Sequence, residues 1–188
     1  MPPAARVTRD MIVAAAVEVA RRQGYESINA RTVAKELHCS TQPVMYHFST
    51  IEELKRAAYA RLDLMHTDCL MTPRGEDPLL GIGLNYIRFA VEEPRLFRFL
   101  FQSGYAVERN VQEMIDSPEL TPVLAAMREG IGTDEKKTRE IFTTLALFVH
   151  GYASIIANNG LEFDEKLAAV QLERVFRGAV AAAMEGEA

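Results

Sequence analysis

The chain has 188 residues, of which 48% are hydrophobic and 25% are charged, and this composition excludes an intrinsically disordered protein. Its two cysteines, Cys39 and Cys69, are too few for a disulfide scaffold or a cysteine-rich zinc module. There is no uninterrupted apolar run of about 18 residues, and the N-terminal residues lack the apolar core of a secretory signal. We therefore expect a soluble, cytoplasmic protein that does not enter a membrane.

The formal charge of −5 is unevenly distributed along the chain. Residues 1–65 contain nine Lys or Arg and seven Asp or Glu, a net charge of +2, whereas residues 66–188 contain twelve and nineteen, a net charge of −7. A mildly basic N-terminal part and an acidic remainder are compatible with binding of a polyanion by the N-terminal part alone. A difference of this size also arises by chance, so charge alone leaves both interpretations open.

Hydrophobic residues spaced three and four positions apart predict helices in the N-terminal part, and strand alternation is hard to find. Thr8, Asn29 and Ser40 are placed as N-caps, and Gly24 is placed to end the first helix in a left-handed turn. The predicted helices are Thr8–Gln23, about Ala30–Leu37, about Thr41–Phe48 with Pro43 in its first turn, and about 51–69.

Residues 71–78 are rich in helix breakers and turn formers and mark a loop. After this loop, helices are predicted at about Leu79–Glu92, Pro94–Gln102, Glu135–Asn158 and Phe163–Met184, with a more broken stretch near Arg109–Gly130. The expected fold class is all-α. We divide the chain into an N-terminal domain at residues 1–50, a connecting helix at 51–70 and a C-terminal domain at 71–188.

The segment Asn29–Phe48 has the pattern of a helix-turn-helix, because two short helices flank the tight turn Leu37–Ser40. In this motif the second helix enters the DNA major groove with its N-terminal end first. Thr41 and Gln42 at the leading end are suited to base edges, and Tyr46 and His47 farther along are suited to phosphates. Small or apolar residues lie where the two helices must touch: Val33, Ala34, Leu37, Cys39 and Val44. Any two short helices joined by a polar turn give a similar pattern, so spacing alone leaves that alternative open.

Residues of about 8–64 resemble the DNA-binding domain of the TetR family of bacterial one-component regulators. The matching features are Gly24-Tyr25, the run Ile28–Leu37, Ser40 before the second helix of the motif, Tyr46-His47-Phe48 and Glu52-Glu53-Leu54. Residues 86–98 and 148–153 are similar to segments in one branch of the ligand-binding domains of the family. The resemblance implies a repressor that binds double-stranded DNA with two-fold symmetry as a homodimer, and that an apolar small-molecule effector releases from its operator.

The resemblance also implies DNA contacts from Arg31, Thr32, Ser40, Thr41, Gln42, Met45, Tyr46, His47 and Lys55. Three positions depart from the family pattern. His38 occupies a turn position usually held by Gly, where a left-handed backbone costs a non-glycine residue roughly 1 kcal/mol. Met45 stands where the family often has Tyr, and Ile51 stands where a Lys is common, so we assign that phosphate contact to Lys55. Operator preference is therefore not transferable from a relative.

The C-terminal domain is rich in aromatic residues, which at helical spacing usually fill a core but also line apolar pockets. In the resemblance this pocket binds the effector, and the candidate lining residues are Tyr86, Phe89, Phe97, Phe101, Phe148, His150 and Tyr152. Each of these residues is equally explained as core. For His150, a buried histidine with satisfied hydrogen bonds is the commoner case.

The last two predicted helices carry more apolar surface than packing against one face of the body requires. This excess predicts a homodimer in which both helices form a four-helix bundle with their copies. The predicted interface residues are Phe148, Tyr152, Ile155, Leu172, Val175, Phe176 and Val180. The alternative is that both helices are simply central core.

The sequence contains no GxSxG, Walker or GxGxxG motif, and its four histidines lack the spacing of metal ligands. We therefore predict no catalytic residue, no metal and no cofactor. One alternative from another class remains, namely an all-helical small-molecule binding protein or enzyme that has lost DNA recognition. It is motivated by Met45, by Ile51 and by the small positive charge of the N-terminal part.

Overall fold

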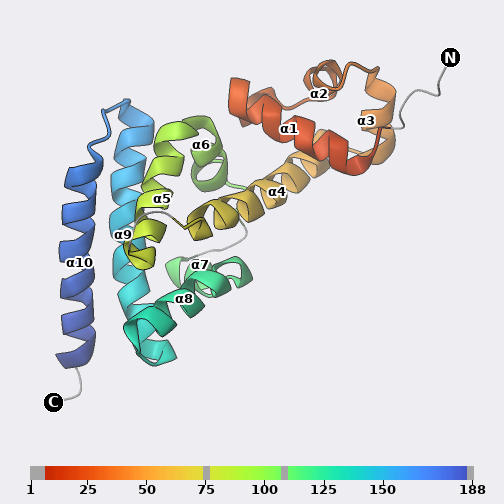
Figure 1. The fold of residues 1–188 in the computed structure, drawn as a ribbon. Helices are drawn as coiled ribbons and strands as arrows, with labels where there is room; N and C mark the ends of the chain where they lie inside the picture. The colour runs from red at the N-terminus through yellow and green to blue at the C-terminus, as the bar shows by residue number, and fades with distance from the viewer. Residues whose placement is uncertain (1–6, 74–76, 107–109, 186–188) are drawn as a thin grey trace. The chain divides into compact units, whose positions relative to one another are not determined.

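The computed structural model describes residues 7–73, 77–106 and 110–185, and Figure 1 shows the fold. Within these ranges every regular element is a helix, which confirms the all-α fold class. The elements are α1 (Arg9–Gln23), η1 (Tyr25–Ser27), α2 (Ala30–Glu36), α3 (Thr41–His47), α4 (Ile51–Met71), α5 (Pro78–Glu92), α6 (Pro94–Gln102), α7 (Val111–Ile115), η2 (Pro118–Leu120), α8 (Thr121–Ile131), α9 (Glu135–Asn159) and α10 (Glu165–Glu185).

Two of the three predicted N-caps are confirmed. Thr8 Oγ1 accepts a hydrogen bond from the Met11 amide at 3.2 Å, and the Asn29 side chain accepts from two amides of α2. Ser40 occupies the N-cap position of α3, but its side chain makes no capping hydrogen bond. Gly24 ends α1 as predicted and has a positive φ of 90°, but its ψ of 153° lies outside the left-handed helical turn that the sequence pattern predicts.

The chain folds into two compact units. The first combines residues 1–65 with residues 95–106, and the second combines residues 66–94 with residues 107–188. Helix α6 therefore packs with the N-terminal helices, whereas the sequence places it in the C-terminal domain. The predicted boundary at residues 70 and 71 separates the DNA-binding part of the chain from the C-terminal domain by function, and this functional division remains a prediction.

In the first unit, α1, α2 and α3 pack around a small apolar core (Figure 1). The core residues Ile12, Val33, Val44 and Phe48 have no exposed surface. Helix α6 adds Phe99, whose ring stacks on Tyr25 with a centroid distance of 5.1 Å. A second tie is the Tyr59 hydroxyl, which donates to the carbonyl of Leu100 at 3.3 Å.

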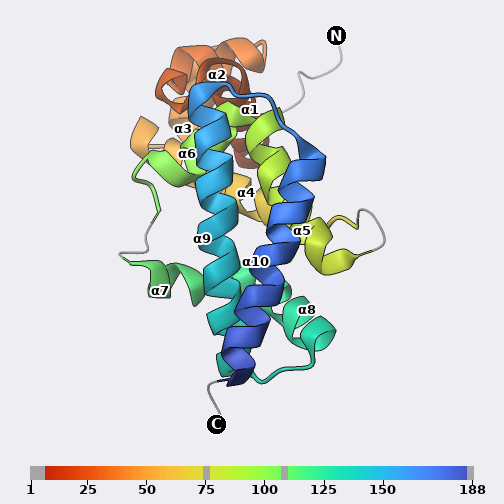
Figure 2. The same ribbon diagram turned by 90° about the vertical axis from the view of Figure 1, so that its left-hand side faces the viewer.

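In the second unit, α5, α9 and α10 lie side by side, and α8 packs against α5 and α9 (Figure 2). One core cluster contains Leu84, Ile87, Val149, Ile156, Ala168 and Leu172, and another contains Leu70, Val123, Met127 and Ile141. Gly83 permits a close approach of α5 and α10, because a Cβ atom at this position would lie 2.4 Å from Cδ2 of Leu172.

Helix α9 is unusually apolar. Among the described residues it is the one helix that is long and apolar enough, by length and composition alone, to cross a membrane. Only 28% of its most apolar window is buried inside the protein. After α5, α8 and α10 have packed against it, the large apolar side chains that stay exposed on α9 are Leu147 and Ile155, at 55% and 54%.

Candidate DNA-binding and effector sites

The turn between α2 and α3 has the hydrogen bonds of a Schellman motif. The amide of Cys39 donates to the Ala34 carbonyl at 3.0 Å, and the amide of His38 donates to the Lys35 carbonyl at 3.2 Å. His38 has a φ of 51°, in the left-handed region that normally favours glycine. The structure thus confirms the expected left-handed turn, and the strained residue is exposed.

Replacing His38 with Gly should stabilise the protein by up to about 1 kcal/mol, because glycine has no Cβ penalty at positive φ. The matched control is Gly160→Ala, where φ is 60° and no atom lies within 4 Å of the added Cβ. That substitution should destabilise by a similar amount through backbone strain alone. Urea unfolding of both variants measures the two effects, and a His38→Gly variant less stable than the wild type would contradict the assignment.

The start of α2 is fixed by a capping box. Asn29 Oδ1 accepts from the amide of Thr32 at 3.1 Å, and Thr32 Oγ1 accepts from the amide of Asn29 at 3.1 Å. The Thr32 hydroxyl also donates to the Ser27 carbonyl at 2.7 Å. Because its hydroxyl is used in these bonds, Thr32 has a structural role at the start of α2, and its contact with DNA remains a prediction.

Helix α3 buries one side and exposes the other. Val44 is fully buried, whereas Thr41, Gln42, Met45 and Tyr46 are exposed. Tyr46 is 77% exposed and Met45 is 45% exposed, although both are large side chains that are usually more buried. An exposed row of polar and apolar side chains on a short second helix is the arrangement required to contact base edges in a major groove.

His47 lies beside this row but is only partly accessible. Its Nε2 lies 3.1 Å from the carbonyl oxygen of Val7, so Nε2 carries a proton and donates to that carbonyl. The Tyr46 ring stands edge-on to the His47 ring, with a centroid distance of 5.2 Å. His47 therefore holds the segment before α1 against the end of α3 and orients Tyr46, a role that sequence spacing did not reveal.

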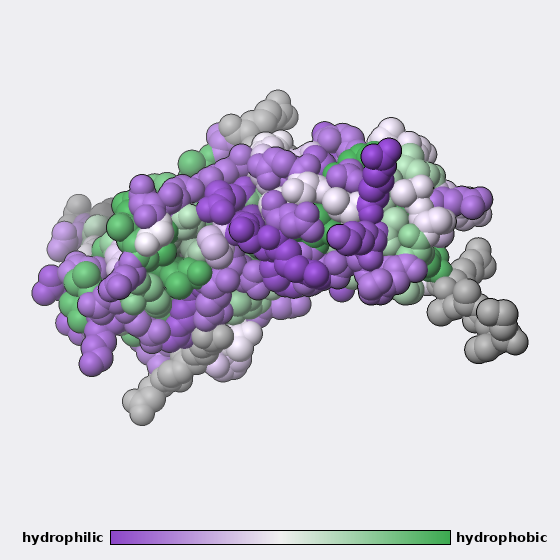
Figure 3. Space-filling view, turned by 90° about the horizontal axis from the view of Figure 1, so that it is seen from above, coloured by the Kyte–Doolittle hydropathy of each residue, from purple (hydrophilic) through white to green (hydrophobic). Residues whose placement is uncertain are grey.

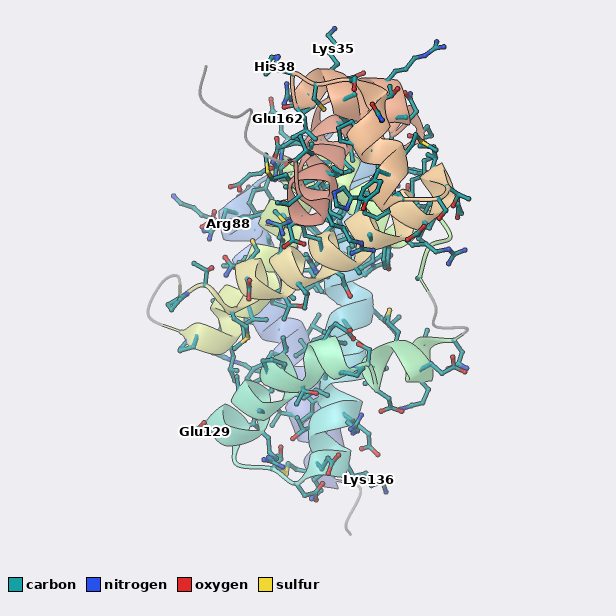
Figure 4. The ribbon with its side chains drawn as sticks, turned by 90° about the vertical axis from the view of Figure 1, so that its right-hand side faces the viewer. Lys35, His38, Arg88, Glu129, Lys136 and Glu162 are labelled. Atoms are coloured by element: carbon teal, nitrogen blue, oxygen red, sulfur yellow. The ribbon has the colours of Figure 1, made fainter. Side chains whose placement is uncertain are left out.

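The cationic side chains of the first unit have different surroundings. Arg31 and Lys35 are exposed on α2, and Figure 4 shows Lys35 and His38 at the outer edge of the unit, pointing away from its core. The Arg9 guanidinium lies 4.6 Å from the centre of the Phe48 ring. The Lys55 ammonium lies 6.0 Å from the centre of the Tyr25 ring, and its side chain is half-buried. Arg31 and Lys35 are thus better placed for phosphates than Lys55.

The second unit contains a hydrogen-bonded network of polar side chains, the polar network, within its apolar interior. The Tyr86 hydroxyl lies 2.8 Å from His150 Nδ1, and His150 Nε2 lies 3.2 Å from the Ser154 hydroxyl. Burial raises the pKa of Tyr86 and lowers the pKa of His150, so both groups are neutral at pH 7. Tyr86 therefore donates to Nδ1, and the proton of the ring resides on Nε2. Ser154 was not among the predicted site residues, although its spacing of four residues from His150 on one helix could have indicated it.

His66 lies next to this polar network. The centroid of its ring is 5.2 Å from that of Tyr86 and 4.8 Å from that of Phe89. Burial lowers the pKa of His66 from 6.5 to about 3. Below pH 6.5 the unfolded chain would bind a proton that the folded protein excludes. Protonation of His66 in the unfolded chain therefore has no effect on the free energy of unfolding above about pH 6.5, and lowers it progressively as the pH falls toward 3.

We expect His66→Gln to reduce the pH dependence of the free energy of unfolding in this range. A single such histidine changes the free energy of unfolding by at most about 1.4 kcal/mol per pH unit. The plots of this free energy against pH for wild type and variant should therefore converge as the pH falls. Urea unfolding at several pH values measures the slopes. Parallel curves for wild type and variant would show that His66 gains its proton in the folded state as readily as in the unfolded state.

The predicted pocket residues are divided between the two units. Tyr86, Phe89, Phe148, His150 and Tyr152 belong to the second unit, and all but Phe89 are half-buried. Phe97 and Phe101 belong to the first unit, where their rings are 4.8 Å apart and Phe97 is completely buried. Phe97 is therefore a core residue of the first unit.

The predicted interface residues are also of two kinds. Ile155 is 54% exposed, whereas Leu172 is only 4% exposed and packs in the core of the second unit. Leu172 thus leaves little surface for a second copy, which corrects its assignment. Four of the remaining residues are half-buried at the edges of the two core clusters: Phe148, Tyr152, Phe176 and Val180. Val175 is also half-buried.

The surface view in Figure 3 shows hydrophilic side chains with smaller apolar areas among them. Among the described residues, no group of three or more His, Cys, Asp or Glu side chains is arranged to hold a metal ion. A helix-turn-helix with an exposed second helix, followed in the same chain by a helical body, defines the protein as a DNA-binding regulator.

Comparison with known families agrees with this class. Residues 12–58 match the family described as "Bacterial regulatory proteins, tetR family", and residues 79–183, more than half of the chain, match "Tetracyclin repressor-like, C-terminal domain". The chain belongs to the TetR family of transcriptional regulators, and it is not an enzyme.

Similar proteins are known at low sequence identity. The HTH-type transcriptional regulator YobS of Bacillus subtilis is 22% identical over 171 residues, which cover 89% of this chain and 88% of YobS. A tetR-family regulator from Streptomyces coelicolor has a TM-score of 0.72 at 18% identity, covering 95% of this chain and 82% of that chain. The multidrug binding protein EbrR complexed with ethidium has a TM-score of 0.55 at 20% identity, covering 89% and 97%. The two structural likenesses show the shared fold.

Proposed function

We propose that this regulator is a repressor, which binds a two-fold operator as a homodimer in the cytoplasm and is released by a small apolar effector. The observation that carries the proposal is the exposed row on α3, where Tyr46 and Met45 are 77% and 45% exposed although both are large side chains. One such helix contacts few base pairs, so a stable complex needs two copies at half-sites about one helical turn apart.

The exposed surface of α9 and α10 supports the homodimer. On α9, Leu147 and Ile155 are 55% and 54% exposed, and they lie eight residues apart on one side of the helix. On α10, Leu167 and Val170 are exposed in the same way, and the two helices are neighbours (Figure 2). Exposed apolar side chains on two neighbouring helices are typical of a self-complementary interface.

The polar network of the second unit supports effector binding. Tyr86, His150 and Ser154 provide oriented hydrogen-bonding groups among aromatic side chains, the combination found in small-molecule sites. EbrR, which shares the fold, is described as a multidrug binding protein and is known in complex with ethidium. A ligand that binds more tightly to the conformation with misaligned DNA-binding units would lower operator affinity by the ratio of its two affinities.

The test is fluorescence anisotropy of labelled duplexes with the full-length protein. If Arg31 and Lys35 of both copies contact phosphates, raising the salt from 50 to 200 mM should weaken binding roughly a hundredfold. Adding the protein to a transcription assay on an operator-bearing promoter should reduce transcript. Absence of salt-sensitive binding to any duplex would favour the alternative of a helical binding protein that has lost DNA recognition, and increased transcript would contradict repression.

A further inference from the structure

We infer that α3 reads an A·T-rich half-site, in which Gln42 recognises adenine and Met45 contacts the methyl group of thymine. The inference rests on the proposed DNA-binding function and adds the base composition that the protein selects. It depends on which side chains α3 exposes, on what these side chains recognise, and on which charged groups α3 lacks.

The exposed side of α3 is formed by Thr41, Gln42 and Met45, which are separated by one, three and four positions. Met45 lies three and four positions after Gln42 and Thr41, so its side chain neighbours both of theirs on the surface of the helix. Val44 and Phe48 on the other side have no exposed surface, so they fix which side of α3 is available. Tyr46 extends the exposed row, and its ring is oriented by His47.

The chemistry of the exposed residues favours A·T pairs. The side-chain amide of Gln42 matches the acceptor N7 and the donor N6 of adenine in the major groove. Met45 carries an apolar, flexible side chain that forms no strong hydrogen bond, so the thymine methyl group is its best partner on a base edge. Thr41 offers a methyl and a hydroxyl group, which suit either base pair.

The groups that recognise G·C pairs are missing from α3. Guanine is most often read by Arg or Lys, and cytosine by Asp or Glu, but α3 has the sequence TQPVMYH and contains none of these. Arg9 and Lys55 each lie against an aromatic ring of the first unit. Arg31 and Lys35 lie on α2, the helix that crosses the phosphate backbone in this motif. These four cations are therefore placed for phosphates and packing.

The first experiment selects bound duplexes from a random pool with full-length wild-type protein, Gln42→Ala, Met45→Ala and Lys35→Ala. We expect A·T pairs at the positions whose preference changes in the Gln42 and Met45 variants. Loss of the Gln42 amide should reduce discrimination at one position by roughly 5- to 150-fold. Lys35→Ala is the control, because loss of a phosphate contact should weaken binding to all duplexes alike and leave the preferences unchanged.

The second experiment replaces with uracil the single thymine that Met45 contacts in one half-site, which removes only one methyl group. The wild type should bind the uracil duplex about fourfold more weakly, as expected for loss of one buried methyl group, whereas Met45→Ala should bind both duplexes equally. Selection of G·C pairs at these positions, or a wild type indifferent to uracil, would overturn the inference and leave the proposed function intact. A protein without salt-sensitive binding to any duplex would overturn the proposed function and the inference with it.

Discussion

Phe99→Ala should lower the free energy of unfolding of the first unit by about 3–5 kcal/mol, the range for truncation of a buried phenylalanine. Phe99 has no exposed surface, and its ring contacts those of Tyr25, Tyr59 and Tyr105 at centroid distances of 5.1, 5.9 and 5.8 Å. Its loss leaves a cavity between α6 and the N-terminal helices. Urea unfolding at constant pH measures the effect.

Tyr46→Ala is the matched control, because it also removes an aromatic ring but from a position that is 77% exposed. Such a surface substitution should change stability by no more than about 0.5 kcal/mol. A Phe99→Ala protein that unfolds at the same urea concentration as Tyr46→Ala would show that α6 is not an integral part of the first unit.

Ile155→Glu should convert the proposed homodimer into monomers and, as a consequence, abolish tight operator binding. The side chain is 54% exposed in one copy, so the substitution leaves the fold of the protomer intact. At a two-fold interface the new carboxylate would be buried in both copies, and an unpaired buried charge costs about 3–5 kcal/mol, which is at least a hundredfold in the dimer dissociation constant. Sedimentation velocity at micromolar concentration measures the oligomeric state, and anisotropy measures operator affinity.

Lys136→Glu is the control for this experiment. It also makes the charge of α9 more negative, but it lies in the exposed first turn of the helix, far along the chain from Ile155 (Figure 4). We expect Lys136→Glu to remain dimeric. A wild type that is monomeric yet binds a two-fold operator tightly would contradict the assembly, as would an Ile155→Glu protein that dimerises normally.

Local sequence features were sufficient to predict most of the helices and the position of the DNA-binding motif. Helices α7 and α8 were not predicted, because they lie in the stretch near Arg109–Gly130 that was expected to be broken. Capping by Thr8 and Asn29 involves amides no more than three residues away, so a sequence window contains the whole interaction. The positive φ of His38 was predictable for the same reason, since the left-handed turn is defined by its neighbours in the chain. Burial of Val33 and Val44 follows from helical periodicity.

Interactions between distant residues were not predictable in this way. The stack of Tyr25 and Phe99 joins α6 to the first unit across more than seventy positions, and no periodicity encodes that pairing. His150 was singled out, but its partner Tyr86 is 64 residues away. Leu172 has the apolar character of an interface residue, and only the close approach at Gly83 shows that it is used inside the protomer.

The aromatic cluster around Phe99 also determines how the protein can be observed. The chain has no tryptophan and six tyrosines, and three of these, Tyr25, Tyr59 and Tyr105, have ring centroids within 6.3 Å of a neighbouring tyrosine in the first unit. Rings held in fixed orientations at such distances contribute strongly to a near-ultraviolet circular dichroism spectrum. That spectrum therefore reports on tertiary packing, through the three clustered tyrosines of the first unit and the hydrogen-bonded Tyr86 of the second. The far-ultraviolet signal reports on the helices of the whole chain.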